Sequence, residues 1–332
     1  MNVSRTLPAT VLALGLALAS ADALAAITAR IATSLPDSHP QTLGARKFAE
    51  LLTEQSHGEI EVQVFGNGVL GNDVNLASML QAGTLEFNVP STATLASLNP
   101  DFSVISLPFQ FDDASQVDAV LDGPAGRTLL DSLADKGIVG LDYWDNGFRH
   151  ITNSRHPVET ADDIDGLKIR TMQNELYIDM FNGLGANAIP MPVNELFTAL
   201  ETRTVDGQEN PFTVIDSKRF YEVQRYLSQT GHAYDAQVLI ASKRFVDSLS
   251  EEQQQLVRDV SREAALYQRQ VSRELNDTLL ARLTDQMSIN EVPLEERQVM
   301  RERLMPVIEE HRAEISEATL SAFDAALAEN RR

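Results

Sequence analysis

Two arginines in apolar surroundings are the residues of this sequence best suited to bind an anion. Arg170 lies within LKIRTM (167–172), and Arg149 lies within WDNGFRHITNS (144–154). A guanidinium stays charged and presents a planar pair of donors that matches a carboxylate. Each arginine therefore predicts either a bound carboxylate or an internal ion pair with one of the many acidic residues, and the pattern alone does not choose between them.

The elements that must position these arginines follow an α/β pattern. From residue 27 onward, short β-rich runs alternate with helical runs, which predicts an α/β domain with a largely parallel sheet. A second α/β unit is predicted to begin near Gly147. Ligands of open α/β sheets bind at the carboxyl ends of strands, and the alternation in LKIRTM places Arg170 at such an end.

A polar segment between two predicted helices adds a third candidate. TVDGQENPF (204–212) has the composition of a rigid polar loop. Asn210 precedes Pro211, which favours an extended backbone at that residue. Its amide can offer a donor and an acceptor to a ligand, or it can cap the following helix.

The longest predicted element covers residues 243–287, a stretch without proline or glycine. At 1.5 Å per residue, one helix of this length could reach across two lobes. The alternative is a pair of helices separated by a bend, because periodicity does not locate a kink.

Composition restricts the class of protein. Residues 1–25 combine a basic start, an apolar run and ALA at 23–25, which predicts a cleaved secretory signal peptide with Ala26 as the first mature residue. The remainder lacks an apolar run of the roughly 20 residues needed to span a bilayer, and it is long enough for two domains. The chain has no cysteine and a net charge of −21, which exclude disulfides and thiolate metal sites and make nucleic acid a poor partner.

One motif favours a different class. GNGVLG (66–71) matches the G-x-G-x-x-G spacing of dinucleotide-binding loops and lies between a predicted strand and a predicted helix, so an exported α/β oxidoreductase is the alternative hypothesis. Against it, this is the second strand–helix unit, and the acidic residue expected about 20 positions later is found too early, at Glu86. The histidines have no metal-site spacing, so we expect no metal, no other cofactor and no catalysis.

Several segments closely resemble the solute receptors of tripartite ATP-independent periplasmic (TRAP) transporters. They are GLKIRTM, LGANAIPMPVNELFTALETRTVDGQENP and FYEVQRYL, and the resemblance extends from residue 27 to the C-terminal helices. It implies a two-lobed α/β clamshell of the periplasmic binding protein type, with a long helix spanning both lobes at residues 243–287. Such a receptor binds an organic acid in its cleft and delivers it to a membrane permease.

The resemblance also implies which residues bind the ligand. The carboxylate-binding arginine of the family corresponds to Arg170, its second arginine to Arg149, and its cleft asparagine to Asn210. Further contacts are implied at His39, Asp73, Ser91 and Asn174.

The expected ligand is a small carboxylate. Ser91 stands where sialate-type receptors carry an acid. The combination of His39 with NSR (153–155) and RTMQN (170–174) resembles the sugar-acid branch, so a hexuronate such as glucuronate or galacturonate is the expected solute. We expect residues 26–147 and 236–275 to form lobe I, and residues 148–235 and 276–332 to form lobe II.

Overall fold

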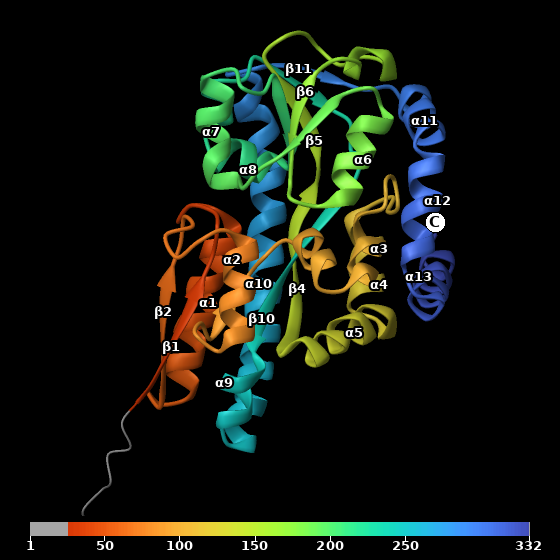
Figure 1. The fold of residues 1–332 in the computed structure, drawn as a ribbon. Helices are drawn as coiled ribbons and strands as arrows, with labels where there is room; N and C mark the ends of the chain where they lie inside the picture. Colours follow the sequence, from red (N-terminus) through yellow and green to blue (C-terminus); the bar gives the residue numbers. More distant parts are fainter. Residues whose placement is uncertain (1–25, 332) are drawn as a thin grey trace, which may run out of the picture.

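The computed structural model describes residues 26–331, and these residues form two α/β lobes, one above the other in the view of Figure 1. The predicted signal peptide, residues 1–25, lies outside the described residues. Within residues 26–331, no helix is both long and apolar enough to cross a membrane.

The first lobe is built on a five-stranded mixed sheet among the described residues, with the order β2-β1-β3-β10-β4. β1 pairs in parallel with β2 and β3, as predicted, whereas β10 is antiparallel to β3 and β4 because it returns from the second lobe. The strands are β1 (Ile27–Ala32), β2 (Ile60–Phe65), β3 (Phe87–Asn88), β4 (Ile138–Phe148) and β10 (Tyr234–Ser242).

Helices cover both faces of this sheet. α1 begins at Pro40, a residue suited to the first turn, and the backbone passes through left-handed Gly58 shortly after the helix ends. The helices of this lobe are α1 (Pro40–Gln55), α2 (Asp73–Ala82), α3 (Ser103–Ser106), α4 (Ala114–Leu121), α5 (Pro124–Asp131) and α9 (Lys243–Ser248), with the 3₁₀ turns η1 (Thr92–Ser97), η2 (Pro100–Phe102) and η3 (Ser132–Lys136).

The second lobe contains a six-stranded sheet in the described part of the chain, with the order β11-β9-β5-β8-β6-β7. Its strands are β5 (His150–Asn153), β6 (Lys168–Thr171), β7 (Asn187–Pro190), β8 (Gly207–Asn210), β9 (Tyr226–Gln229) and β11 (Ser288–Glu291). The accompanying helices are α6 (Glu175–Gly183), α7 (Val193–Glu201) and α8 (Phe212–Ser217), with η4 (Ala161–Ile164) and η5 (Phe220–Glu222).

The position of β8 corrects one prediction. The segment predicted to be a rigid polar loop contains a fully buried strand, β8, which pairs with β5 on one side and β6 on the other. A polar sequence can form a central strand here because its side chains bind one another and neighbouring polar residues, so burial leaves few of them unsatisfied. The expected extended backbone at Asn210 is confirmed, since Asn210 ends this strand.

The long helix predicted over residues 243–287 is divided into two helices. α9 ends at Ser248, and α10 (Glu251–Thr284) is a helix of 34 residues with Ser250 as its N-cap. Ser250 and Gln253 form a capping box, which satisfies the first backbone N–H groups and explains the new start. α10 packs against α1 and β4 of the first lobe and against α8 of the second, so the expectation of a helix spanning both lobes is confirmed (Figure 1).

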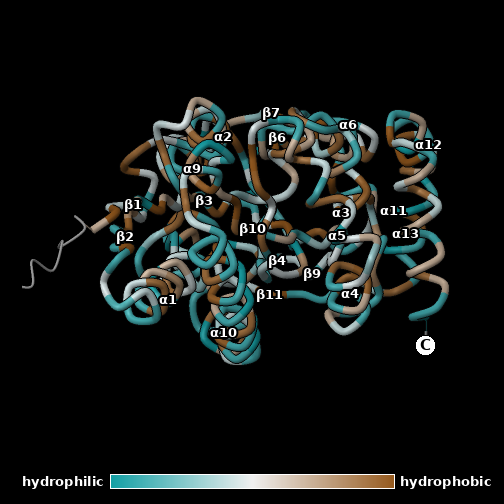
Figure 2. Tube along the Cα trace, turned by 90° about the horizontal axis from the view of Figure 1, so that it is seen from below, coloured by the Kyte–Doolittle hydropathy of each residue, from teal (hydrophilic) through white to brown (hydrophobic). Residues whose placement is uncertain are grey.

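Figure 2 colours much of α10 hydrophilic, in agreement with its position at the surface. Its inner face is apolar: Val257, Val260 and Ala264 are buried in a hydrophobic cluster with Phe48 of α1 and Trp144 of β4. This packing fixes α10 on the first lobe.

The C-terminal part forms α11 (Leu294–Arg303), α12 (Met305–Glu314) and α13 (Glu317–Glu329). α12 packs against α6 in the second lobe, whereas α13 packs against α4 and α5 in the first. The exact division of the chain into 26–147 with 236–275, and 148–235 with 276–332, stays a prediction.

The lobes are also joined by β4 and β10, which pair over nearly their whole length. Their register shifts between Asp235 and Ala236, opposite the left-handed Gly147. Beyond this point the backbone of Arg149 bonds to Ala233 and then enters β5 of the second lobe. The crossing strands therefore bring Arg149 and Asp235 to the boundary between the lobes.

Candidate functional site: a polar cleft between the lobes

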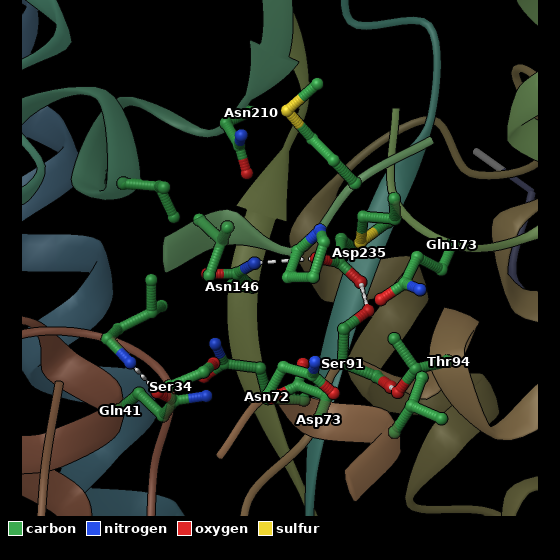
Figure 3. Close-up of a pocket in the computed structure, with 18 of the residues that line it drawn as sticks. Ser34, Gln41, Asn72, Asp73, Ser91, Thr94, Asn146, Gln173, Asn210 and Asp235 are labelled. Atoms are coloured by element: carbon green, nitrogen blue, oxygen red, sulfur yellow. Dashed lines mark hydrogen bonds between the residues drawn. The ribbon is translucent and has the colours of Figure 1, made fainter. Parts of the chain in front are cut away.

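A pocket lies between the two lobes, and residues of both lobes line it (Figure 3). Figure 3 shows Asn210 on one side of the pocket and Asn72 and Asp73 on the other. The first lobe contributes mainly acids, amides and hydroxyls, whereas the second contributes arginine, amide and apolar groups. The lining includes Ser34, Gln41, Asn72, Asp73, Ser91, Thr94, Asn146, Arg149, Arg170, Met172, Gln173, Met191, Asn210, Asp235 and Gln237.

Arg170 is the buried cation of this pocket that lacks a salt bridge. β6 places it beside β8, and its side chain is only 2 % exposed. Nε and Nη2 donate to the backbone oxygen of Met191 at 2.8 and 2.6 Å, and within residues 26–331 Nη1 has no hydrogen-bond partner and no carboxylate lies within salt-bridge distance. Burial lowers the pKa of Arg170 to about 10. The guanidinium is therefore charged at neutral pH and held in place by a neutral carbonyl.

Arg149 lines the same pocket in a different electrostatic environment. Its side chain is fully buried, Nε donates to Glu209 at 2.5 Å, and Nη1 donates to Asp235 at 2.8 Å. Nη2 binds Glu209 again and also donates to Asn210. Burial works to lower the pKa of Arg149, but the charge of Glu209 outweighs it and raises the pKa. The internal ion pair, one of the two alternatives for this arginine, is present in the structure.

Asn210 is both buried and at the pocket wall, at the end of β8. Its Oδ1 accepts from Arg149, and its Nδ2 donates to Gln208 Oε1 at 2.5 Å. Gln208 in turn donates to Thr152 of β5. This chain of hydrogen bonds fixes the amide at the pocket wall, and Asn210 does not cap α8, whose N-cap residue is Pro211.

The opposite wall carries two carboxylates, Asp235 and Asp73. Asp235 accepts from Ser91 and Asn146, both at 2.6 Å, as the dashed lines in Figure 3 show. Burial raises the pKa of Asp235, although Arg149 acts in the opposite direction. Burial likewise raises the pKa of Asp73 to about 6, against hydrogen bonds with the Ser34 side chain and the Ser91 backbone.

Two of the predicted ligand contacts do not line this pocket. His39 is the N-cap of α1, where Nδ1 accepts from the backbone of Gln41, and burial lowers its pKa to about 3. Asn174 caps α6 by accepting from Tyr177, while its Nδ2 donates to the backbone oxygen of Ala93. Arg170, Arg149, Asn210, Asp73 and Ser91 are brought together at the pocket, whereas His39 and Asn174 lie beside it.

GNGVLG forms the turn between β2 and α2. Its backbone N–H groups are used inside the protein: Asn67 bonds to Leu35, Gly68 to Thr33, and Gly71 to Gly68. A phosphate-binding loop needs such groups free for the ligand. This geometry gives the oxidoreductase hypothesis no support.

Sequence reasoning missed Asp235, Gln237 and Asn146. Asp235 and Gln237 alternate with apolar residues along the fully buried β10, and Asn146 lies on the neighbouring β4. Buried polar residues on one face of an apolar strand were the available signal, because such groups need specific partners. Among the described residues, no group of three or more His, Asp or Glu side chains could hold a metal.

The architecture and the polar cleft define a bacterial extracellular solute receptor. The model of the family "Bacterial extracellular solute-binding protein, family 7" (DctP) matches residues 31–314, and the chain belongs to this family. It is a family of receptors, and its relatives include solute-binding proteins of TRAP transporters. The expected two-lobed fold is confirmed by the solved structures of these proteins.

Three similar proteins have reported ligands. The structure of the sugar acid binding protein DctPAm from Advenella mimigardefordensis, in complex with galactonate, is 45% identical with a TM-score of 0.88, covering 91% of this chain and 98% of that chain. The 2,3-diketo-L-gulonate-binding protein YiaO of Escherichia coli is 40% identical over 78% of this chain and 79% of its own. A TRAP solute-binding protein from Sulfitobacter with bound β-D-galacturonate is 31% identical, with a TM-score of 0.86 and coverage of 91% and 99%.

Proposed function

We propose that this protein is the periplasmic receptor of a TRAP transporter and that its solute is a six-carbon sugar acid. A hexuronate such as galacturonate or glucuronate is the first candidate, and an aldonate such as galactonate is the nearest chemical alternative. The receptor delivers the solute to the membrane permease and does not transform it. The observation that carries the proposal is the buried Arg170, whose Nη1 has no protein partner within residues 26–331.

A bound carboxylate supplies the negative charge that the Arg170 guanidinium lacks. It restores a counter-charge to a buried guanidinium whose pKa burial has lowered, and it matches the two parallel donors of the fork. One charge-assisted hydrogen bond contributes about 1.5–3 kcal/mol, whereas micromolar affinity requires about 8 kcal/mol. The remaining free energy must come from other polar contacts and from exclusion of water by the surrounding lobes.

The opposite wall favours hydroxyl groups on the rest of the solute. Asp73 and Asp235 are acceptors, and Asn146 Oδ1 and Gln237 Oε1 are buried acceptors without a hydrogen-bond partner among the described residues. A sugar acid brings hydroxyl donors to such acceptors. A second carboxylate would instead meet two acidic side chains at short range, which is unfavourable in a buried site. The cleft therefore suits a monocarboxylate with several hydroxyls better than a dicarboxylate.

The known ligands of the three relatives described above point in the same direction. Galactonate, 2,3-diketo-L-gulonate and galacturonate each combine one carboxylate with a chain or ring of oxygen-bearing carbons. The relatives that bind them are 31–45% identical to this chain.

A thermal-shift screen followed by calorimetry tests the proposal. The panel contains galacturonate, glucuronate, galactonate and succinate, with the neutral sugar galactose as a control for the carboxylate. We expect a sugar acid to raise the melting temperature and to bind with micromolar or tighter affinity, while galactose and succinate bind at least tenfold more weakly. Stronger binding of succinate, or no response to any sugar acid, would contradict the proposal.

A further inference from the structure

Two polar contacts cross from one lobe to the other on the sides of the cleft without lining the pocket. The first joins Asn174, which follows β6 of the second lobe, to Ala93 in η1 of the first. Asn174 Nδ2 donates to the backbone oxygen of Ala93 at 2.7 Å, and both residues are buried. A buried hydrogen bond between two lobes is lost when the lobes separate.

The second contact joins Lys218, the C-cap residue of α8 in the second lobe, to Asn67 in the GNGVLG turn of the first. Lys218 Nζ lies 3.3 Å from Asn67 Oδ1. Burial lowers the pKa of Lys218 to about 8, against the charge of Asp73. This hydrogen bond joins the two lobes, so it is lost when the lobes separate and stabilises only the closed arrangement.

The GNGVLG turn is shaped to reach the second lobe. Asn67 and Gly68 both have left-handed backbone conformations, with φ of 57° and 68°. A Cβ added at Gly68 would lie 3.8 Å from Nδ2 of Asn194 in α7, so the turn lies against that helix. The tight turn therefore places Asn67 within reach of Lys218.

An apolar contact between the lobes accompanies these polar ones. Leu35, from the loop after β1, is buried in the hydrophobic cluster of the second lobe with Leu196 of α7 and Val214 of α8. Apolar contact has little directional preference, whereas the two polar contacts require one relative position of the lobes. The polar pair is thus suited to define the closed arrangement.

We propose that Asn174 and Lys218 are positioning residues that hold the lobes closed around the solute and set its residence time. This inference rests on the proposed receptor function. Within residues 26–331, neither side chain lines the pocket, so neither selects between solutes. A residue that stabilises only the closed state changes the affinity for every solute by the same factor, whereas a ligand contact changes the ratios between solutes.

Two variants remove the contacts and retain the local structure. Asn174→Ser keeps an oxygen that can cap α6 but lacks the Nδ2 donor, because serine and asparagine are comparable N-cap residues. Lys218→Met keeps the apolar stem and removes the ammonium group. Lys243→Met is the matched control, because Lys243 pairs with Asp247 on the exposed side of α9.

Stopped-flow dissociation of galacturonate and galactonate tests the proposal. We expect each of the two variants to release both acids about 3- to 10-fold faster, with the ratio of the two affinities unchanged within about twofold. Lys243→Met should match the unmodified protein. Unchanged dissociation rates in Asn174→Ser and Lys218→Met, or a changed affinity ratio, would overturn the assignment.

A second measurement does not depend on the solute. Because the chain has no cysteine, the double substitution Glu61→Cys and Glu201→Cys places one spin label on each lobe at exposed positions. We expect the label distances without solute to shift towards the open arrangement in both variants, and identical distributions would contradict the proposal. If no sugar acid binds the unmodified protein, the proposed solute is wrong, while this distance measurement still tests the two contacts.

Discussion

Arg170 and Arg149 are two buried arginines in one pocket, and their surroundings differ in one decisive respect. Arg149 contacts the carboxylates of Glu209 and Asp235, whereas the hydrogen bonds of the Arg170 side chain within residues 26–331 all go to the backbone oxygen of Met191. Both line the same pocket, and for both the residue pattern left the same two alternatives, a bound carboxylate or an internal ion pair. The comparison teaches that burial alone does not identify a ligand anchor. The missing counter-charge identifies the anchor, because a buried charge without a partner is costly until a ligand supplies the opposite charge.

The largest expected effect is on binding when Arg170 is removed. Arg170→Ala should lower affinity for the sugar acid by at least about 100-fold, since two charge-assisted hydrogen bonds of about 1.5–3 kcal/mol each are lost. The melting temperature without solute should remain within a few degrees, because Arg170 has no ion pair to lose within residues 26–331. Calorimetry and thermal unfolding measure the two effects. Arg170→Lys should bind with intermediate affinity, because lysine keeps the charge but not the planar fork.

For Arg149 we expect the larger effect on the stability of the fold rather than on the affinity for the solute. Arg149→Met leaves Glu209 and Asp235 buried without their cation, which should destabilise the fold by about 3–5 kcal/mol. Urea unfolding without solute measures this loss. A stable Arg149→Met protein that has merely lost affinity would show that Arg149 acts mainly on the ligand, and the contrast between the two arginines would then fail.

A smaller effect on affinity is expected when Asn210 is replaced, a residue that accepts a hydrogen bond from Arg149 and lines the pocket together with Arg170. Asn210→Ala removes an acceptor of Arg149 and a polar group at the pocket wall. We expect a 3- to 10-fold loss of affinity with little loss of stability, as for one neutral hydrogen bond. An affinity equal to that of the unmodified protein, measured by calorimetry, would limit Asn210 to a structural role.

The smallest expected effect concerns the pH dependence of stability. Burial raises the pKa of Asp73 from its ordinary value of 3.8 to about 6, so the folded protein binds this proton more tightly than the unfolded chain does. Stability contributed by this group should therefore increase as pH falls through 6 and be complete below about 4. Relative to Asp73→Asn, the unmodified protein should gain melting temperature between about pH 7.5 and about pH 4.5. A constant difference between the two proteins across this range would show that Asp73 does not titrate as described.

The sequence was sufficient for features encoded locally. The alternation in LKIRTM correctly placed Arg170 at the end of a strand, and the glycine and proline positions located α1. The polar strand β8 was predicted as a loop, because its burial depends on Thr152 and Arg149, which come from distant segments. Local polarity does not reveal such partners.

The same limit explains the parts of the site that the sequence did not reveal. Asp235 joins Ser91 and Asn146, and these three residues meet only when β10 returns beside β4. His39 and Asn174 do not line the pocket, and both are N-cap residues; their contact with the ligand stays a prediction. A capping residue next to a site is difficult to distinguish from a contact residue by sequence alone, because both are short polar side chains at the start of a helix.

A crystal structure of the receptor with its sugar acid tests the central claim most directly. We predict that the solute carboxylate lies within about 2.7–3.2 Å of the Arg170 guanidinium, with Nη1 as one of the donors. The Arg149 ion pairs with Glu209 and Asp235 should be unchanged in that complex. A carboxylate bound elsewhere in the cleft, or Arg170 paired with an acidic side chain of the protein in the complex, would contradict the account.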